Sequence, residues 1–74
     1  GHSIGLENHE PPEIASSEYL PGFKDYALEE GMVLCIEMPY YELGTGGISM
    51  EDAILITKDG WEYITTMSRE LAVV

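Results

Sequence analysis

Positive charge is scarce in this sequence. Three lysine and arginine residues stand against fourteen aspartate and glutamate residues, which gives a formal net charge of −11. A chain with this balance repels the phosphates of nucleic acids and the headgroups of anionic lipids, so we expect no nucleic acid and no membrane as partners. We expect most of the acidic residues to be solvated at the surface. The remaining ones favour cations as ligands.

Cysteine and long apolar runs are also scarce. Cys35 is the single cysteine, so no internal disulfide can form, and we predict a cytoplasmic protein because this usage is typical of reducing compartments. No apolar run reaches the roughly 20 residues that a membrane-spanning helix needs. With 74 residues the chain allows at most one small domain. It does not begin with Met and its strongest motif lies at its start, so we expect the C-terminal piece of a longer protein.

Alternation of apolar and polar residues is the main secondary-structure signal. It predicts antiparallel strands at residues 32–41, 48–57 and 61–65, with a short strand at 1–5 beside them. A glycine-rich hinge at 44–47 and a turn at 58–60 separate the strands, and Gly60 suits the positive φ of a tight hairpin. Residues 9–12 predict an extended turn. For residues 13–28 we predict an irregular connection with one helical turn near 16–20. The tail after 66 either forms a last helical turn or frays.

One acid lies within the most apolar of these strands. Period two places Val33, Cys35 and Glu37 on one face of it. An unpaired carboxylate among apolar residues is unfavourable, so Glu37 indicates a nearby cation. We interpret Cys35 as a small core residue and not as a nucleophile, because no electropositive neighbour activates it.

Three potential metal ligands follow from this pattern. His2 lies near a strand end, Glu37 lies within one strand and Glu51 within the next. One imidazole and two carboxylates suit Mn, Fe or Co and are also acceptable to Zn. Spacing alone leaves other readings open, because any acidic β domain brings some glutamate near some histidine.

Four ordered blocks of sequence resemble one enzyme family. They are Gly1-His2-Ser3-Ile4-Gly5-Leu6-Glu7-Asn8-His9-Glu10-Pro11-Pro12, Leu28-Glu29-Glu30-Gly31-Met32-Val33, Cys35-Ile36-Glu37-Met38-Pro39 and Gly46-Gly47-Ile48-Ser49-Met50-Glu51-Asp52. The first resembles the Gly-His-x-Ile-Gly-Leu-x-x-His-Glu-x-Pro signature of the pita-bread metallopeptidases, and together they are most similar to the Xaa-Pro branch, aminopeptidase P and prolidase. The resemblance implies an α+β fold, the creatinase/aminopeptidase or pita-bread fold, of which residues 1–74 are the C-terminal part of a single catalytic domain and mostly antiparallel β.

The resemblance also implies roles for four residues. His2 and Glu37 would bind one of two divalent metal ions, and Glu51 would bridge both. His9 would contact the substrate near the scissile carbonyl, and Glu37 would help to move a proton of the bridging water that attacks it, which makes His9 and Glu37 the catalytic pair. The implied substrate is a short peptide with proline at its second position, and the implied full-length protein is a homodimer. For His9, a turn-stabilising role before Pro11 is the alternative.

This sequence departs from the family pattern in two ways. Ser49 stands where Xaa-Pro members often carry an arginine, and two aspartate ligands of the family lie upstream of this sequence, so it holds three of five ligands. We therefore expect the isolated chain to be inactive. Other readings stay open: a creatinase-like hydrolase, a metal-using lyase or a binding pseudoenzyme on the same fold. If Gly1-His2-Ser3 is a cloning remnant, His2 leaves the ligand set.

Overall fold

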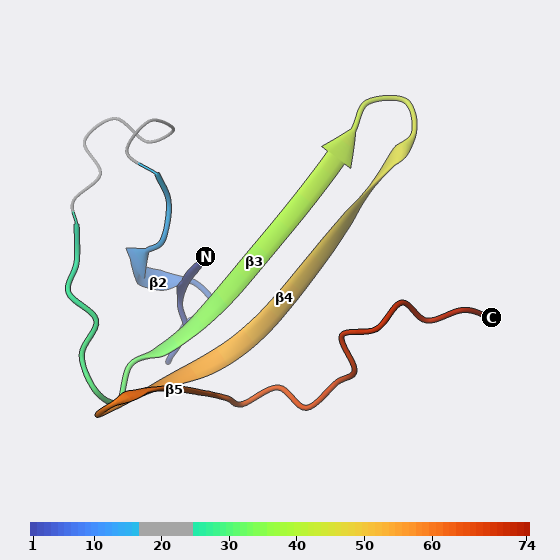
Figure 1. The fold of residues 1–74 in the computed structure, drawn as a ribbon. Coiled ribbons are helices and arrows are strands. Elements are labelled where there is room, and N and C mark those ends of the chain that lie inside the picture. The colour runs from blue at the N-terminus through green and yellow to red at the C-terminus, as the bar shows by residue number, and fades with distance from the viewer. Residues whose placement is uncertain (17–24) are drawn as a thin grey trace.

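The chain forms one antiparallel sheet. The computed structural model describes residues 1–16 and 25–74, and its five strands lie in the order β2-β1-β3-β4-β5 (Figure 1). The strands are β1 (His2–Ser3), β2 (Glu10–Glu13), β3 (Val33–Glu42), β4 (Gly46–Thr57) and β5 (Gly60–Tyr63). The predicted antiparallel β character of this chain is thus confirmed. The α part of the α+β fold concerns the whole family domain and stays a prediction.

A long hairpin of β3 and β4 dominates the sheet (Figure 1). Its ladder runs from the pair Val33 and Leu55 to the pair Glu42 and Gly46. The predicted hinge at 44–47 is therefore too long, because Gly46 and Gly47 belong to β4. The ring of Tyr41 occupies the place that a Cβ of Gly47 would need, which explains a glycine within the ladder. The turn is closed by the Thr45 amide, which donates to the Glu42 carbonyl at 3.1 Å.

The second hairpin is tighter than the sequence indicates. Thr57 pairs directly with Gly60, so only two residues form the loop. The predicted positive φ at Gly60 is wrong: in the described part of the chain, positive φ occurs at Gly31, Gly44 and Gly46. β5 ends at Tyr63 because the next two amides, of Ile64 and Thr65, both turn to the Ala53 carbonyl.

The N-terminal segment folds into two short strands. β1 covers only two of the five predicted residues, and the predicted extended turn at 9–12 instead starts strand β2. In the connection between β1 and β2, the carboxylate of Glu10 accepts a hydrogen bond from the Glu7 amide at 2.8 Å. The predicted helical turn near 16–20 lies almost entirely outside the described residues. The tail after residue 66 contains no helical turn.

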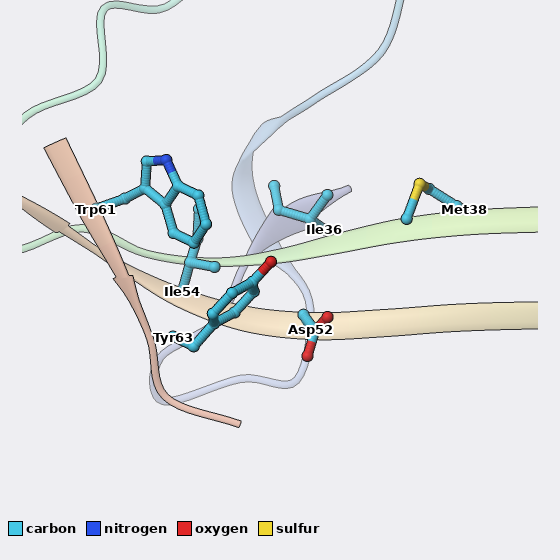
Figure 2. Close-up of a pocket in the computed structure, with 6 residues that line it drawn as sticks. All are labelled: Ile36, Met38, Asp52, Ile54, Trp61 and Tyr63. Carbon is cyan, nitrogen blue, oxygen red and sulfur yellow. The ribbon is translucent and has the colours of Figure 1, made fainter. Parts of the chain in front are cut away.

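The core is small and lies where β1, β3 and β4 meet. Leu34, Cys35 and Ile54 are its buried apolar residues. On one face of the sheet a pocket of about 200 Å³ is lined by Ile36, Met38, Asp52, Ile54, Trp61 and Tyr63 (Figure 2). Among the residues that the structure describes, no helix has the length and apolar character to cross a membrane.

Candidate metal centre

His2 is the buried polar residue of the sheet, with only 4% of its surface exposed. Its Nδ1 lies 2.9 Å from the backbone oxygen of Ser3. A carbonyl oxygen only accepts, so Nδ1 carries the proton, and in the neutral ring the lone pair lies on Nε2. This tautomer is the one that a metal-binding histidine needs when Nε2 is the ligand.

A glycine allows His2 to sit against β3. His2 pairs with Cys35 in the ladder between β1 and β3. A Cβ on Gly1 would collide with the backbone carbonyl oxygen of Cys35. Gly1 therefore permits the close approach of the two strands that places the imidazole beside the side chains of β3.

Glu37 and Glu51 complete the predicted trio. They are direct cross-strand partners in β3 and β4, and the Glu37 Oε1 lies 3.7 Å from the His2 Nε2. This separation exceeds a hydrogen bond. It is close to the roughly 3.5 Å between neighbouring ligands of a tetrahedral ion whose bonds are about 2.0–2.2 Å long. The structure therefore brings the three predicted ligands to one face, although their role as ligands stays a prediction.

His9 lies against His2 and is exposed. Its ring stacks on that of His2, with centroids 3.8 Å apart and planes 23° from parallel. The turn between β1 and β2 carries it, so it lies on the solvent side of the buried His2. This position fits a group that meets substrate, the role that the sequence predicts for it.

Cys35 lies beside the candidate metal ligands, which its predicted role as a core residue does not indicate. It is buried, as predicted, with 5% exposed. Its Sγ, one ring nitrogen of His2 and one carboxylate oxygen of Glu51 all lie within 4.8 Å of one another. Burial raises the pKa of the Cys35 thiol, and so do a hydrogen bond to Glu51 and the charges of Glu51 and Glu37. The sequence did contain a signal for this position, because the period-two pattern places Cys35 on the same face of the strand as Glu37.

The opposite face of β4 carries an arrangement that the sequence did not predict. Asp52 receives two hydrogen bonds from Arg69, at 2.8 and 2.9 Å, and one from the Thr65 hydroxyl at 2.5 Å. The guanidinium also lies 3.5 Å above the centre of the Tyr63 ring. Consecutive residues of a strand point to opposite faces, so this clamp of Asp52, Thr65, Arg69 and Tyr63 fixes β4 directly behind Glu51. The bonds from Thr65 and then Arg69 lower the pKa of Asp52.

The donor set fits a divalent metal ion. It consists of an imidazole nitrogen, two carboxylates and a neighbouring sulfur, all presented by strands and not by loops. Carboxylates directly opposite each other in a sheet repel, and a cation between them reverses that effect. Fold and site together define an antiparallel β sheet that presents potential ligands for a divalent metal ion on one face.

Comparison with known proteins agrees with such a site. The model of metallopeptidase family M24 matches residues 1–58, and the chain belongs to this family. It is 44% identical over 73 residues to a protein named Xaa-Pro dipeptidase from Lactobacillus delbrueckii subsp. lactis, covering 99% of this chain and 18% of that protein. It is 42% identical over 71 residues to a protein of the same name from Pyrococcus horikoshii, covering 96% and 18%. No solved structure matches the chain.

The family assignment confirms the resemblance seen in the sequence and implies the use of divalent metal. The chain spans about a fifth of the length of these relatives, 18% in both cases. What the whole protein does is therefore a matter of proposal.

Proposed function

We propose that this chain is the C-terminal part of a metal-dependent Xaa-Pro peptidase, of the aminopeptidase or dipeptidase type, which cleaves the peptide bond before proline. The observation that supports this most strongly is the convergence of His2, Glu37 and Glu51 on one face of the sheet. Family membership and relatives named Xaa-Pro dipeptidase support the substrate class.

The three ligands divide the work of holding two divalent ions. His2 and Glu37 would hold one ion and Glu51 would serve as a ligand to both, and the family resemblance implies two further aspartate ligands from outside this chain. The ions, when bound, supply a Lewis acid and an activated water. Mn, Co and Fe suit the oxygen-rich set, and Zn is also acceptable to it.

Two residues act on the substrate and on protons. His9 donates a hydrogen bond near the scissile carbonyl, where its exposed ring above His2 leaves it accessible. Glu37, whose side chain is 36% exposed, would help to move the proton of the attacking water. The substrate is a short peptide with proline in the second position.

The test uses the full-length protein, meaning the complete chain that contains residues 1–74. The metal-free protein is supplied in turn with Mn, Co, Fe and Zn and assayed on an Xaa-Pro dipeptide and an Xaa-Pro-Xaa tripeptide. Matched peptides with alanine in place of proline are the control. We expect metal-dependent cleavage of the proline peptides alone, with the dipeptide distinguishing dipeptidase from aminopeptidase. Equal cleavage of the alanine peptides would contradict the specificity, and no cleavage with metal bound would favour a creatinase-like hydrolase, a lyase or a binding protein.

Two further properties remain proposals: a homodimeric full-length protein and a cytoplasmic location. The free thiol of Cys35 supports a reducing compartment. Sedimentation of the full-length protein tests the first property, and cell fractionation tests the second.

A further inference from the structure

The sulfur of Cys35 lies among the ligands of the proposed centre. Cys35 pairs with His2 on one side and with Ala53 on the other, so it is the middle residue of a row across β1, β3 and β4. Glu51 lies two residues before Ala53 and so points to the same face. These positions bring the sulfur, an imidazole nitrogen and a carboxylate oxygen within 4.8 Å of one another.

The buried imidazole is aimed at this point. The Nδ1–H of His2 donates a hydrogen bond to the Ser3 carbonyl at 2.9 Å, and Nε2 lies 3.7 Å from the Glu37 carboxylate of β3. A lone pair beside carboxylates, on a ring with 4% exposure, is favourable only with a cation or a proton between them. The buried imidazole beside Glu37 therefore points to a cation next to the cluster of His2, Cys35 and Glu51.

We propose that Cys35 supplies a sulfur ligand to the ion held by His2 and Glu51, which makes the centre selective for Zn²⁺ or Co²⁺ over Mn²⁺. The proposal rests on the metal centre of the proposed function and adds a ligand that the family resemblance does not imply. Binding breaks the S–H bond and forms a sulfur–metal bond, the proton leaves to solvent, and no electron is transferred.

The geometry requires only a small contraction. Bonds of about 2.0–2.3 Å to nitrogen, oxygen and sulfur place neighbouring tetrahedral ligands roughly 3.5 Å apart. The cluster spans at most 4.8 Å before any ion draws its members inward. Thiolate is a soft ligand that Zn prefers, whereas Mn prefers oxygen, so one sulfur is enough to change the order of preference.

Cobalt reports sulfur ligation directly. The full-length metal-free protein is loaded with Co²⁺, and its near-ultraviolet absorption is recorded beside its cobalt content. We expect a sulfur-to-cobalt charge-transfer band that Cys35→Ser and Cys35→Ala both abolish. Ser49→Ala is the matched control, because Ser49 precedes Glu51 by two residues as Cys35 precedes Glu37, and that variant should keep the band. We also expect Cys35→Ser to lower the ratio of Zn²⁺ to Mn²⁺ affinity by roughly 10- to 100-fold, the range that supporting groups around metal ligands already reach.

Several outcomes would overturn the proposal. Cobalt bound to the unaltered protein without the band would leave Cys35 as a hydrogen-bond donor to Glu51 alone, and this result needs no variant to fold. A band that persists in both Cys35 variants would assign the sulfur elsewhere. Cleavage of Xaa-Pro peptides is measured separately. A band without cleavage would contradict the proposed function and support the sulfur ligand. Cleavage without a band would support the proposed function and contradict the sulfur ligand.

Discussion

Glu37 and Glu51 face each other directly across the β3–β4 ladder. Like charges in this position destabilise a sheet. A shift of the register by one residue would exchange Glu51 for Asp52 on this face, so the pairing is specific to one register. The hairpin holds it through ten consecutive residue pairs, from Val33 and Leu55 to Glu42 and Gly46. The proposed function assigns a cation to the space between these two carboxylates, and a cation there would offset their repulsion.

The first prediction follows from the proposed role of Glu51 as a ligand to both ions. Glu51→Gln keeps the size of the side chain and removes its charge, so we expect the full-length protein to lose most of its metal from both positions, and its activity with it. Plasma emission measures the metal beside the rate. Glu42→Gln, at the far end of β3, is the control and should keep its metal. A Glu51→Gln protein with its full metal content would show that Glu51 is not a bridge.

The second prediction separates His9 from the ligands. His9→Ala should leave the metal content unchanged and slow turnover by roughly 100-fold or more, the scale of one lost transition-state donor. The reason is that His9 is exposed and its ring stacks on that of the buried His2, with centroids 3.8 Å apart. If His9→Ala loses as much metal as Glu51→Gln, then His9 is a ligand and its assigned role is wrong.

Period-two patterning was sufficient to predict the hairpins and the faces of β3 and β4. It placed Glu37 and Glu51 on strands whose ladder now pairs them. The errors lie at strand ends. Gly46 and Gly47 look like a hinge by composition, yet the cross-strand neighbour Tyr41 makes a glycine favourable within the strand. Such tertiary contacts leave no local signal.

Long-range polar contacts were the other part that the sequence did not predict. Arg69 and Asp52 are 17 residues apart, and only the turn back from β5 brings them together. The sulfur of Cys35 became part of the site through its register with His2, which depends on a two-residue strand. Patterns too short to show a period do not predict such pairings.

The third prediction concerns the clamp and acidity. The pKa of Asp52 is lowered in the fold by Thr65 and Arg69. A carboxyl with a lowered folded pKa stabilises the fold above its ordinary pKa, and this stabilisation disappears as the pH falls through the folded value. We therefore expect Asp52→Asn to lower the midpoint of thermal unfolding of the full-length protein at neutral pH. The difference from the unaltered protein should shrink below the ordinary aspartate range, under about pH 4.

The control for the clamp is Asp59→Asn, which removes the same charge from the exposed β4–β5 turn. It should change the midpoint less than Asp52→Asn does. A difference between Asp52→Asn and the unaltered protein that is constant across pH would contradict the role of the Asp52 charge.

The fourth prediction concerns the chain as it stands. Three predicted ligands cannot enclose two divalent ions, so the isolated chain of 74 residues should bind at most one ion weakly and cleave no peptide. Calorimetric titration with Mn²⁺, with a peptide assay beside it, measures both. Tight binding of two ions per chain, or any turnover of an Xaa-Pro dipeptide, would show that the site is complete without ligands from outside residues 1–74.

The last prediction tests whether the small core supports the centre. Leu34 is fully buried at 0% exposure and pairs with Ile54, next to the pair of Cys35 and Ala53, whereas Leu43 in the β3–β4 turn is fully exposed. Leu34→Ala should therefore lower the free energy of unfolding of the full-length protein by about 2–5 kcal/mol, since it leaves a cavity. Leu43→Ala makes the same chemical change at the surface and should alter it by less than about 0.5 kcal/mol. Urea unfolding measures both variants, and equal effects would mean that packing at Leu34 does not stabilise the sheet that holds His2 and Glu37.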